Sequence, residues 1–370
     1  MASLLETFAT VPDPRKALNR RHKLIDILTI AICTVICGGT GYEDMELYGT
    51  SQQEWFQTFL ELPAGIPSHD TFRDVFRRLD PKQFEEHFRH WVQGIAEVAG
   101  GTVINLDGKT LRGSRRGVAP GIHLVSAWAS QNQLVLGQLK TADHSNEITA
   151  IPELLRVLAL QGCIVTIDAM GCQTAIARQI TEQEGDYVLA LKDNHPTLRT
   201  AVETMFDQAR ATKFTHLPHT FHQTVDADHG RIETRRCWAT SHLEPLPAAL
   251  RDAWPGLTSL IRLDSIRDHQ GTVSTESRYY LSSLPAHAEQ LLSVIRSHWG
   301  IENRLHWVLD VTFREDDCRI RTGHGPENLT VLRHFALNLL KQETSAKKSV
   351  RAKRLKAGWN HHYLLKVLTS

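Results

Sequence analysis

The feature that most constrains the fold is a change in hydrophobic period after Gly100-Gly101. Before it, apolar side chains recur at helical spacings, whereas the chain after it alternates between strand-like and helical segments. The run 163–167 is continuously apolar, as expected of a strand buried on both faces of a sheet. The expected order is strand 103–107, a hairpin of strands 123–129 and 133–139, helix 148–160, strand 163–167, helix 172–183 and strand 187–191. The sequence therefore predicts an α/β domain with a mixed sheet, part meander and part parallel, flanked by helices.

Three further regions complete the predicted organisation. Residues 1–98 are expected to be an all-helical N-terminal domain, in which the apolar helix 24–37 is too short to span a membrane and is interpreted as a core helix. Strand-like segments at about 214–284 form a β-rich insertion within the α/β domain of residues 101–340. Residues 341–370 carry eight basic residues and one acid, and they are predicted to be a basic C-terminal tail.

The N-terminal domain contains a pattern that occurs in DNA-binding proteins. A helix is expected at 44–60, and Ser68 is expected to cap another that ends at the Asp80-Pro81 step. Two amphipathic helices joined by a tight turn suit a helix-turn-helix reader. Its exposed basic residues would be Arg73, Arg77 and Arg78. Plain helical packing gives the same pattern, so both interpretations stay open.

Two aspartates follow predicted strands of the α/β domain. Asp107 and Asp168 each stand at the C-terminal end of a strand, where ligands collect in open α/β sheets. If these strands are neighbours, the carboxylates face each other, and like charges at such a distance resist joint ionisation unless a cation lies between them. Carboxylate oxygens without cysteine or histidine partners select Mg2+ or Mn2+ over zinc. Each aspartate could instead cap its own turn.

A third carboxylate lies in the segment 295–310, which reads as a helix. Apolar residues recur around Glu302 at three- and four-residue spacings: Leu292, Ile295, Trp299, Leu305 and Leu309. Glu302 would therefore lie on or beside the buried stripe, where a carboxylate needs a cation or a site cleft. His298, Glu302, His306 and Asp310 also form a polar edge, and an ordinary solvated edge with i, i+4 pairs is the alternative.

Three groups of basic residues are candidates for contact with phosphates. The loop after Asp107 carries Lys109, Arg112, Arg115 and Arg116, and the strand of the insertion at 229–235 places His229, Arg231 and Arg235 on one face. The third group is the tail segment 347–356. Each could instead be a solvated surface.

Composition and cysteine usage indicate the cellular compartment. The chain has 42 Lys and Arg residues and 41 Asp and Glu residues, so its overall charge does not indicate a class of binding partner. The six cysteines include no CxxC pair, and four lie in apolar or strand-like runs, which favours reduced thiols and the cytosol. No signal peptide and no membrane association are expected.

Seven motifs resemble one family of mobile-element proteins. They are LDGKTLRGS (106–114), HLVSAWAS (123–130), TADHSNEITAIPELL (141–155), IDAMGCQ (167–173), ALKDNHP (190–196), HGRIETR (229–235) and SHWGIENRLHWVLDVTFREDDCRIR (297–321). The chain resembles, over essentially its whole length, insertion-sequence transposases of the H-repeat-associated type, which belong to the DDE superfamily. The resemblance implies an RNase H-like fold, a β-rich insertion, and Asp107, Asp168 and Glu302 as the catalytic and metal-binding triad.

The resemblance fails around Glu302 at three positions. Related transposases are expected to carry Tyr, Arg and Lys there, and this chain has Ile295, His298 and Leu309. Arg296, Arg304 and His306 are possible substitutes for the missing DNA contacts. His298 is itself also a candidate DNA contact.

The resemblance also implies the reaction and the partners. Two Mg2+ or Mn2+ ions, about 3.5–4 Å apart, would serve hydrolysis at the element ends and attack of the freed 3′-hydroxyls on target DNA. The expected partner is double-stranded DNA, both inverted repeats and target, bound by a homo-oligomer in the bacterial cytoplasm. A stand-alone metal-dependent nuclease and a decayed DNA-binding remnant are the alternatives.

Overall fold

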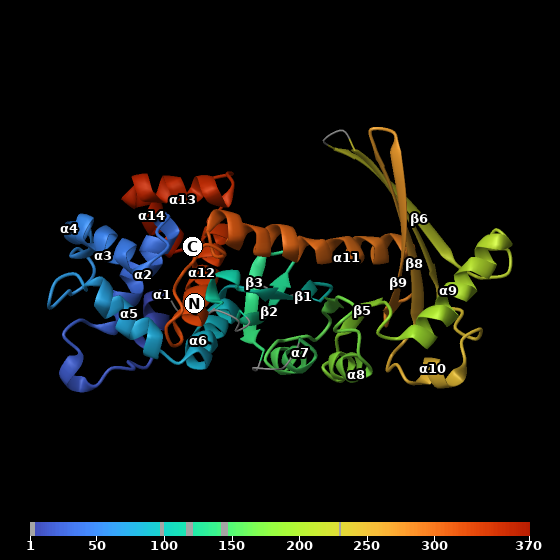
Figure 1. Cartoon of the computed structure of the whole chain (residues 1–370), viewed down its shortest axis with the longest axis horizontal. Coiled ribbons are helices and arrows are strands. Elements are labelled where there is room, and N and C mark those ends of the chain that lie inside the picture. The colour runs from blue at the N-terminus through green and yellow to red at the C-terminus, as the bar shows by residue number, and fades with distance from the viewer. Residues whose placement is uncertain (1–3, 97–99, 116–120, 142–146, 229–230) are drawn as a thin grey trace.

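The computed structural model describes residues 4–96, 100–115, 121–141, 147–228 and 231–370. The predicted DNA contacts Arg116 and His229 lie outside these ranges. Figure 1 shows an elongated molecule, with a helical body at one end, a projecting β-sheet arm at the other and a long helix running between them.

The N-terminal region is helical, as predicted. Its helices are α1 (Leu4–Ala9), α2 (Leu24–Cys37), α3 (Tyr42–Ser51), α4 (Gln53–Phe56), α5 (His69–Arg78) and α6 (Pro81–Ile95). The helix expected at 44–60 is broken at Gln52, which divides α3 from α4. Helix α2 has the predicted bounds, is buried along almost its whole length and ends at Gly38, whose φ of 117° requires glycine.

The mixed sheet is built from the predicted strands. They are β1 (Val103–Thr110), β2 (His123–Ala129), β3 (Leu134–Lys140), β4 (Ile164–Ile167) and β5 (Asp186–Leu191). Strands β1, β2 and β3 form an antiparallel meander, while β1, β4 and β5 are parallel neighbours. This confirms the predicted α/β class and the RNase H-like combination of meander and parallel strands.

The insertion adds four strands to the same sheet. They are β6 (Thr220–Asp228), β7 (Arg231–Thr240), β8 (Ser259–His269) and β9 (Thr272–Ser282). Strand β9 pairs antiparallel with β5, from Leu191 opposite Tyr279 to Val188 opposite Ser282. The strand order is β3-β2-β1-β4-β5-β9-β8-β7-β6. The insertion thereby covers the free edge of β5, and its far ends project as the arm in Figure 1.

Helices cover both faces of the sheet. On one face, α7 (Glu147–Arg156) packs on β2 and β3, α8 (Thr174–Glu182) on β5 and α9 (Pro196–Ala211) on β9. Helix α10 (Ala248–Asp252) precedes β8. On the other face, α11 (Ala288–Ile301) crosses β1, β4 and β5 and reaches the strands of the arm (Figure 1). It continues as two π-helical segments, Glu302–His306 and Val308–Thr312.

The C-terminal helices return to the N-terminal ones. Helix α12 (Gly325–Gln342) packs on α2 and α6, and the predicted basic tail folds as α13 (Val350–Trp359) and α14 (His361–Leu368). Asn328 donates to the carbonyls of Phe76 and Leu79, both at 2.8 Å. The two ends of the chain therefore form one helical body.

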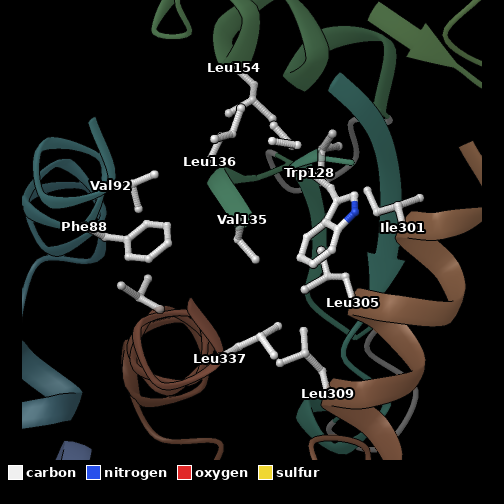
Figure 2. Close-up of a cluster of buried hydrophobic side chains, with 14 of the residues drawn as sticks. Phe88, Val92, Trp128, Val135, Leu136, Leu154, Ile301, Leu305, Leu309 and Leu337 are labelled. Carbon is white, nitrogen blue, oxygen red and sulfur yellow. The ribbon is translucent and has the colours of Figure 1, made fainter. Parts of the chain in front are cut away.

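An apolar cluster joins this body to the sheet and to the Glu302 segment. Figure 2 shows side chains from α6, α7, α12, β2, β3 and the end of α11 meeting in one core. The labelled residues are Phe88, Val92, Trp128, Val135, Leu136, Leu154, Ile301, Leu305, Leu309 and Leu337. The core fixes the position of the segment that carries Glu302.

Within the described residues, no single helix combines the length and apolar character needed to cross a membrane. Helices α2 and α3 reach that threshold only as a pair, which is bent by 96° between them.

Candidate active site

Asp107 and Asp168 occupy matching positions on adjacent strands. The parallel register of β1 and β4 ends at Leu106 opposite Ile167, so the next residue on each strand is an aspartate. The prediction that β1 ends at Asp107 is wrong, because the strand continues to Thr110 by pairing with β2, with Asp107 opposite Ser126. Burial and, to a smaller extent, the charge of Asp168 raise the pKa of Asp107 to about 6, although His306 opposes the shift.

Asp168 also caps its own turn. Its Oδ1 accepts hydrogen bonds from the backbone amides of Met170 at 3.1 Å and Gly171 at 3.4 Å. Burial and the charge of Glu147 raise the pKa of its carboxyl, while these amides lower it. Asp168 therefore caps its turn, as the alternative interpretation predicted. This cap is compatible with a role in the site, since the amides fix the carboxylate at the edge of the sheet.

Glu302 begins the first π-helical segment after α11, close to Asp107. Nδ1 of His306 lies 3.0 Å from Oε2 of Glu302 and 3.5 Å from Oδ2 of Asp107. One ligand atom from each of the three residues lies within 4.8 Å of the others. The hydrogen bond from His306 lowers the pKa of Glu302, although partial burial opposes this. The wide π-helical turn, a feature found often at functional sites, carries this carboxylate.

Glu302 stands at the exposed edge of the buried stripe, not within it. The side chain of Glu302 is 57% exposed, whereas Ile301 and Leu305 are buried. Trp299, predicted to lie on the stripe, is 50% exposed. The reason is that His298 takes the inward position, where its Nδ1 lies 2.9 Å from Oγ1 of Thr166, so the helical phase turns Trp299 outward.

The three predicted carboxylates line one cavity of about 450 Å3. Its walls include Asp107, Asp168, Glu302, Thr166, Lys192, Arg278, His298 and Trp299. Asp168 is outside the close group of three ligand atoms but opens into the same space. The cavity lies where β1, β4 and α11 meet.

His298 helps to position α11 over the sheet. Burial lowers its pKa to about 4, so the imidazole is neutral near pH 7 and offers no positive charge to a phosphate. The hydroxyl of Thr166 donates to Oδ1 of Asn105 at 2.7 Å, and Nδ2 of Asn105 donates to the Ser297 carbonyl at 2.9 Å. Sequence reasoning missed Asn105 and Thr166, because both read as ordinary strand residues.

Lys109 lies in a buried ionic cluster behind the cavity. Its ammonium contacts the carboxylates of Asp310 and Glu315, the latter at 2.6 Å, and Arg333 lies 3.2 Å from Glu315. A phosphate would have to compete with two carboxylates for Lys109. The same contact occupies Asp310, the alternative third ligand.

Of the other residues in the predicted basic loop, Arg112 is 78% exposed, with its Nε 3.6 Å from Asp316, and Arg115 is exposed.

Four of the remaining predicted DNA contacts lie together in a second cavity. Arg231, Arg235, Arg296 and Arg304 line a second cavity of about 590 Å3 between α11 and the arm. Arg267 and Arg278 line it too. The sequence analysis did not single out Arg267 and Arg278, because only the register of β7, β8 and β9 brings them to this face.

The residues of the first cavity fit a divalent cation. Their donors are mostly carboxylate oxygens, the ligands that Mg2+ and Mn2+ prefer. Burial is the main cause of the raised pKa values of Asp107 and Asp168, and neighbouring carboxylates add to it, so a bound cation would favour their ionised forms.

A meander and parallel strands with acidic residues at the meeting point of two central strands define an RNase H-like protein. Residues 99–339 match the family described as Transposase DDE domain, and residues 5–92 match the one described as DDE_Tnp_1-associated. The chain therefore belongs to the DDE-domain transposase family.

Full-length relatives agree with this assignment. The chain is 40% identical to "Putative transposase YncI" of Escherichia coli O157:H7, with 100% of this chain and 95% of that one covered. It is 39% identical to "H repeat-associated putative transposase YhhI" of Escherichia coli K12, over 100% and 98%. Among solved structures, a piggyBac transposase synaptic complex with hairpin DNA has a TM-score of 0.44 and 13% identity, covering 99% of this chain and 75% of that chain.

Proposed function

We propose that this transposase cuts phosphodiester bonds at the ends of a DNA element and joins the freed 3′-hydroxyls to target DNA at one site. The observation that carries the proposal is the convergence of Asp107, Asp168 and Glu302, from β1, β4 and the end of α11, on one cavity. Family membership supplies the transposase class, and this geometry supports the choice of residues.

Asp107, Asp168 and Glu302 would hold Mg2+ or Mn2+, two ions in our proposal, with His306 beside them. When bound, such ions activate the attacking oxygen and stabilise the leaving oxygen of a phosphodiester. The backbone amides of Met170 and Gly171 hold Asp168 in place. His306 orients Glu302 toward Asp107 through its buried ring. The sheet therefore positions Asp107 and Asp168, and the segment after α11 positions Glu302.

DNA would reach this cavity as double-stranded element ends and target. Arg112 and Arg115, exposed on the loop after β1, are proposed to contact its backbone. We further propose that the protein acts as a homo-oligomer on DNA in the bacterial cytoplasm, where its six free cysteines would stay reduced.

Glu302→Gln tests the proposal, with Asp310→Asn as the matched control. The first change keeps the size of the side chain and removes its charge, so cleavage and joining of a supercoiled plasmid should fall by at least about 100-fold while DNA binding persists. Asp310→Asn alters the pairing with Lys109 and should leave measurable activity.

The metal requirement is checked in the same assay. Wild-type activity should need Mg2+ or Mn2+, and Ca2+ should inhibit it because its coordination geometry is looser. Full activity in EDTA, or near-wild-type cleavage by Glu302→Gln, would refute the assignment. Cleavage of the plasmid without any joined product would indicate a stand-alone nuclease.

A further inference from the structure

Six arginines line the second cavity, which we call the arginine groove. They come from three strands of the arm and from the segment that carries Glu302: Arg231, Arg235, Arg267, Arg278, Arg296 and Arg304. Glu233 is the acidic residue in the lining. The groove lies between α11 and the face of the arm turned toward it. This arrangement concentrates positive charge in a chain whose overall charge is almost balanced.

Internal salt bridges leave this charge only partly neutralised. Glu233 contacts Arg235 at 2.6 Å, Arg267 at 3.2 Å and Arg231 at 3.6 Å. Asp226 contacts Arg235 and also Arg296, the latter at 3.0 Å. Glu276 contacts Arg278 at 2.8 Å. Among the side chains that the structure describes, these three carboxylates are the ones paired to the groove's six arginines.

The arginines are also open to a ligand. The side chain of Arg231 is 52% exposed and that of Arg267 is 42% exposed, whereas Glu233, which they share, is 9% exposed. Exposed ion pairs contribute little to stability, so holding the arm together is a weak reason for so many guanidinium groups. Guanidinium groups that face solvent in a concave site match the paired oxygens of phosphates.

The groove adjoins the catalytic cavity. Arg278 and Trp299 line both spaces, and the Arg278 guanidinium lies over the Trp299 ring at 5.1 Å. Trp299 is 50% exposed. A polynucleotide that leaves the catalytic cavity on this side would next meet the six arginines.

We propose that the arginine groove binds a single strand of DNA that continues from the bond being cut. A cationic groove bordered by an exposed aromatic ring is the arrangement by which proteins hold single strands, with phosphates on the cations and a base against the ring. The inference rests on the proposed function, because the bound strand is the continuation of the strand that the catalytic site cuts. It assigns Arg267 and Arg278 a role that sequence patterns did not indicate.

Binding of a fluorescent oligothymidine to the full chain, measured in EDTA, tests the proposal without any cleavage. The groove variant is Arg231→Gln with Arg267→Gln. Its control is Arg210→Gln with Arg236→Gln, which removes the same charge from exposed positions outside the groove. Arg236 lies on β7 beside Arg235 and points to the opposite face.

We expect the groove variant to bind at least about 10-fold more weakly and the slope of log K against log salt to decrease by about 1.4, which is 0.7 for each of two phosphate contacts. The control should keep the wild-type affinity and slope, and equal melting temperatures would show that both variants fold. Wild-type affinity in the groove variant, or a loss confined to duplex DNA, would overturn the proposal.

Plasmid cleavage separates this inference from the proposed function. Loss of single-strand binding in the groove variant, together with no cleavage by wild-type protein in Mg2+ or Mn2+, would support the groove assignment and refute the proposed cleavage reaction. If wild-type protein cleaves and the groove variant binds single strands normally, the chemistry stands and the groove assignment fails.

Discussion

His306 is a buried side chain that contacts two of the proposed catalytic carboxylates. Its Nδ1 lies 3.0 Å from Glu302 and 3.5 Å from Asp107, while its Nε2 is buried without a hydrogen-bond partner among the described residues. The ring therefore orients the half-exposed Glu302 carboxylate. Contacts of this kind orient metal ligands, and losing them typically costs about 10–100-fold in metal affinity or activity.

We expect His306→Phe to weaken Mn2+ binding about 10-fold and to lower cleavage by a similar factor. His216→Phe, at an exposed position outside the cavity, should change neither. Mn2+ binding is measured directly by titration calorimetry, so the result does not depend on turnover. Unchanged Mn2+ affinity in His306→Phe would show that the ring packs beside the site without orienting it.

The environment of Glu315 leads to a prediction about the pH dependence of stability. Burial opposes its ionisation, but Lys109 and Arg333 outweigh that effect and lower the pKa of Glu315 to about 2. A lowered carboxyl pKa contributes stability at pH values above the ordinary pKa of 4.5, and this contribution is lost as pH falls from there toward 2. The free energy of unfolding should therefore decrease across that window.

Glu315→Gln should lower the free energy of unfolding by about 3 kcal/mol at pH 7, because Arg333 and Lys109 lose a buried carboxylate partner. It should also flatten the loss of stability between pH 4.5 and pH 2. Urea denaturation at several pH values measures both effects. Asp317→Asn, at an exposed pair with Arg314, is the control and should change stability little. Equal stability of Glu315→Gln and wild type at pH 7 would contradict this account.

At the scale of the elements, local patterns were sufficient for most strands and helices. The boundaries of β2 and β5 were predicted within about one residue, because each is a short, mostly apolar run. The pairing of β5 with β9 was not predictable in the same way. It depends on long-range register, and nothing in the local sequence states which edge the insertion will cover.

The candidate site was predictable in its residue types more than in its contacts. Asp107 and Asp168 were expected to face each other if their strands were neighbours, and β1 and β4 are adjacent parallel strands with Leu106 opposite Ile167. The ion pairs of Lys109 and the inward turn of His298 were not predicted. Each depends on a partner far away in the sequence: Glu315 for Lys109, at 2.6 Å, and Thr166 for His298, at 2.9 Å.

Helix α13 holds the Glu302 segment and the N-terminal helices together through Arg354. Its guanidinium donates to the carbonyl of Val35 at 2.8 Å and to that of Thr312, and it lies 4.2 Å from the centre of the Phe313 ring. Burial lowers the pKa of Arg354 to about 10, so it remains charged at neutral pH. The end of the π-helical region is therefore tied to the helical body by one side chain.

Arg354→Met keeps much of the apolar contact and removes both hydrogen bonds, so we expect a loss of about 2–4 kcal/mol in the free energy of unfolding. Amide exchange in residues 302–312 should become faster. Arg351→Met, on the exposed side of the same helix, should leave both measurements unchanged. Protection at 302–312 that is the same in all three proteins would show that the core in Figure 2 holds this segment without Arg354.

At the scale of the whole molecule, α11 connects the projecting arm with the helical body (Figure 1). Residues on one side of α11 line the arginine groove, and Glu302 follows directly after its last residue. The apolar core under its end makes the position of Glu302 depend on β2, α6 and α12 together.

The folded C-terminal region changes how its positive charge must be tested. Lys353 and Arg354 are buried and donate to backbone carbonyls, Lys353 to Leu340 at 2.7 Å and Arg354 to Val35 at 2.8 Å. These two are structural, and deleting the region would expose the α2 surface that α13 covers. Lys347, Lys348 and Arg351 are exposed and remain free to approach a phosphate backbone.

We therefore predict the effect of Lys347→Gln, Lys348→Gln and Arg351→Gln combined in the full chain. If these residues contact duplex backbone, the slope of log K against log salt should decrease by about 0.9 per lost contact, up to about 2.7, with an unchanged melting temperature. Fluorescence anisotropy of a labelled duplex at several salt concentrations measures the slope. An unchanged slope would mean that DNA does not touch this helix, and its exposed charges would then be solvated groups on a helix whose buried residues hold the chain's end against its beginning.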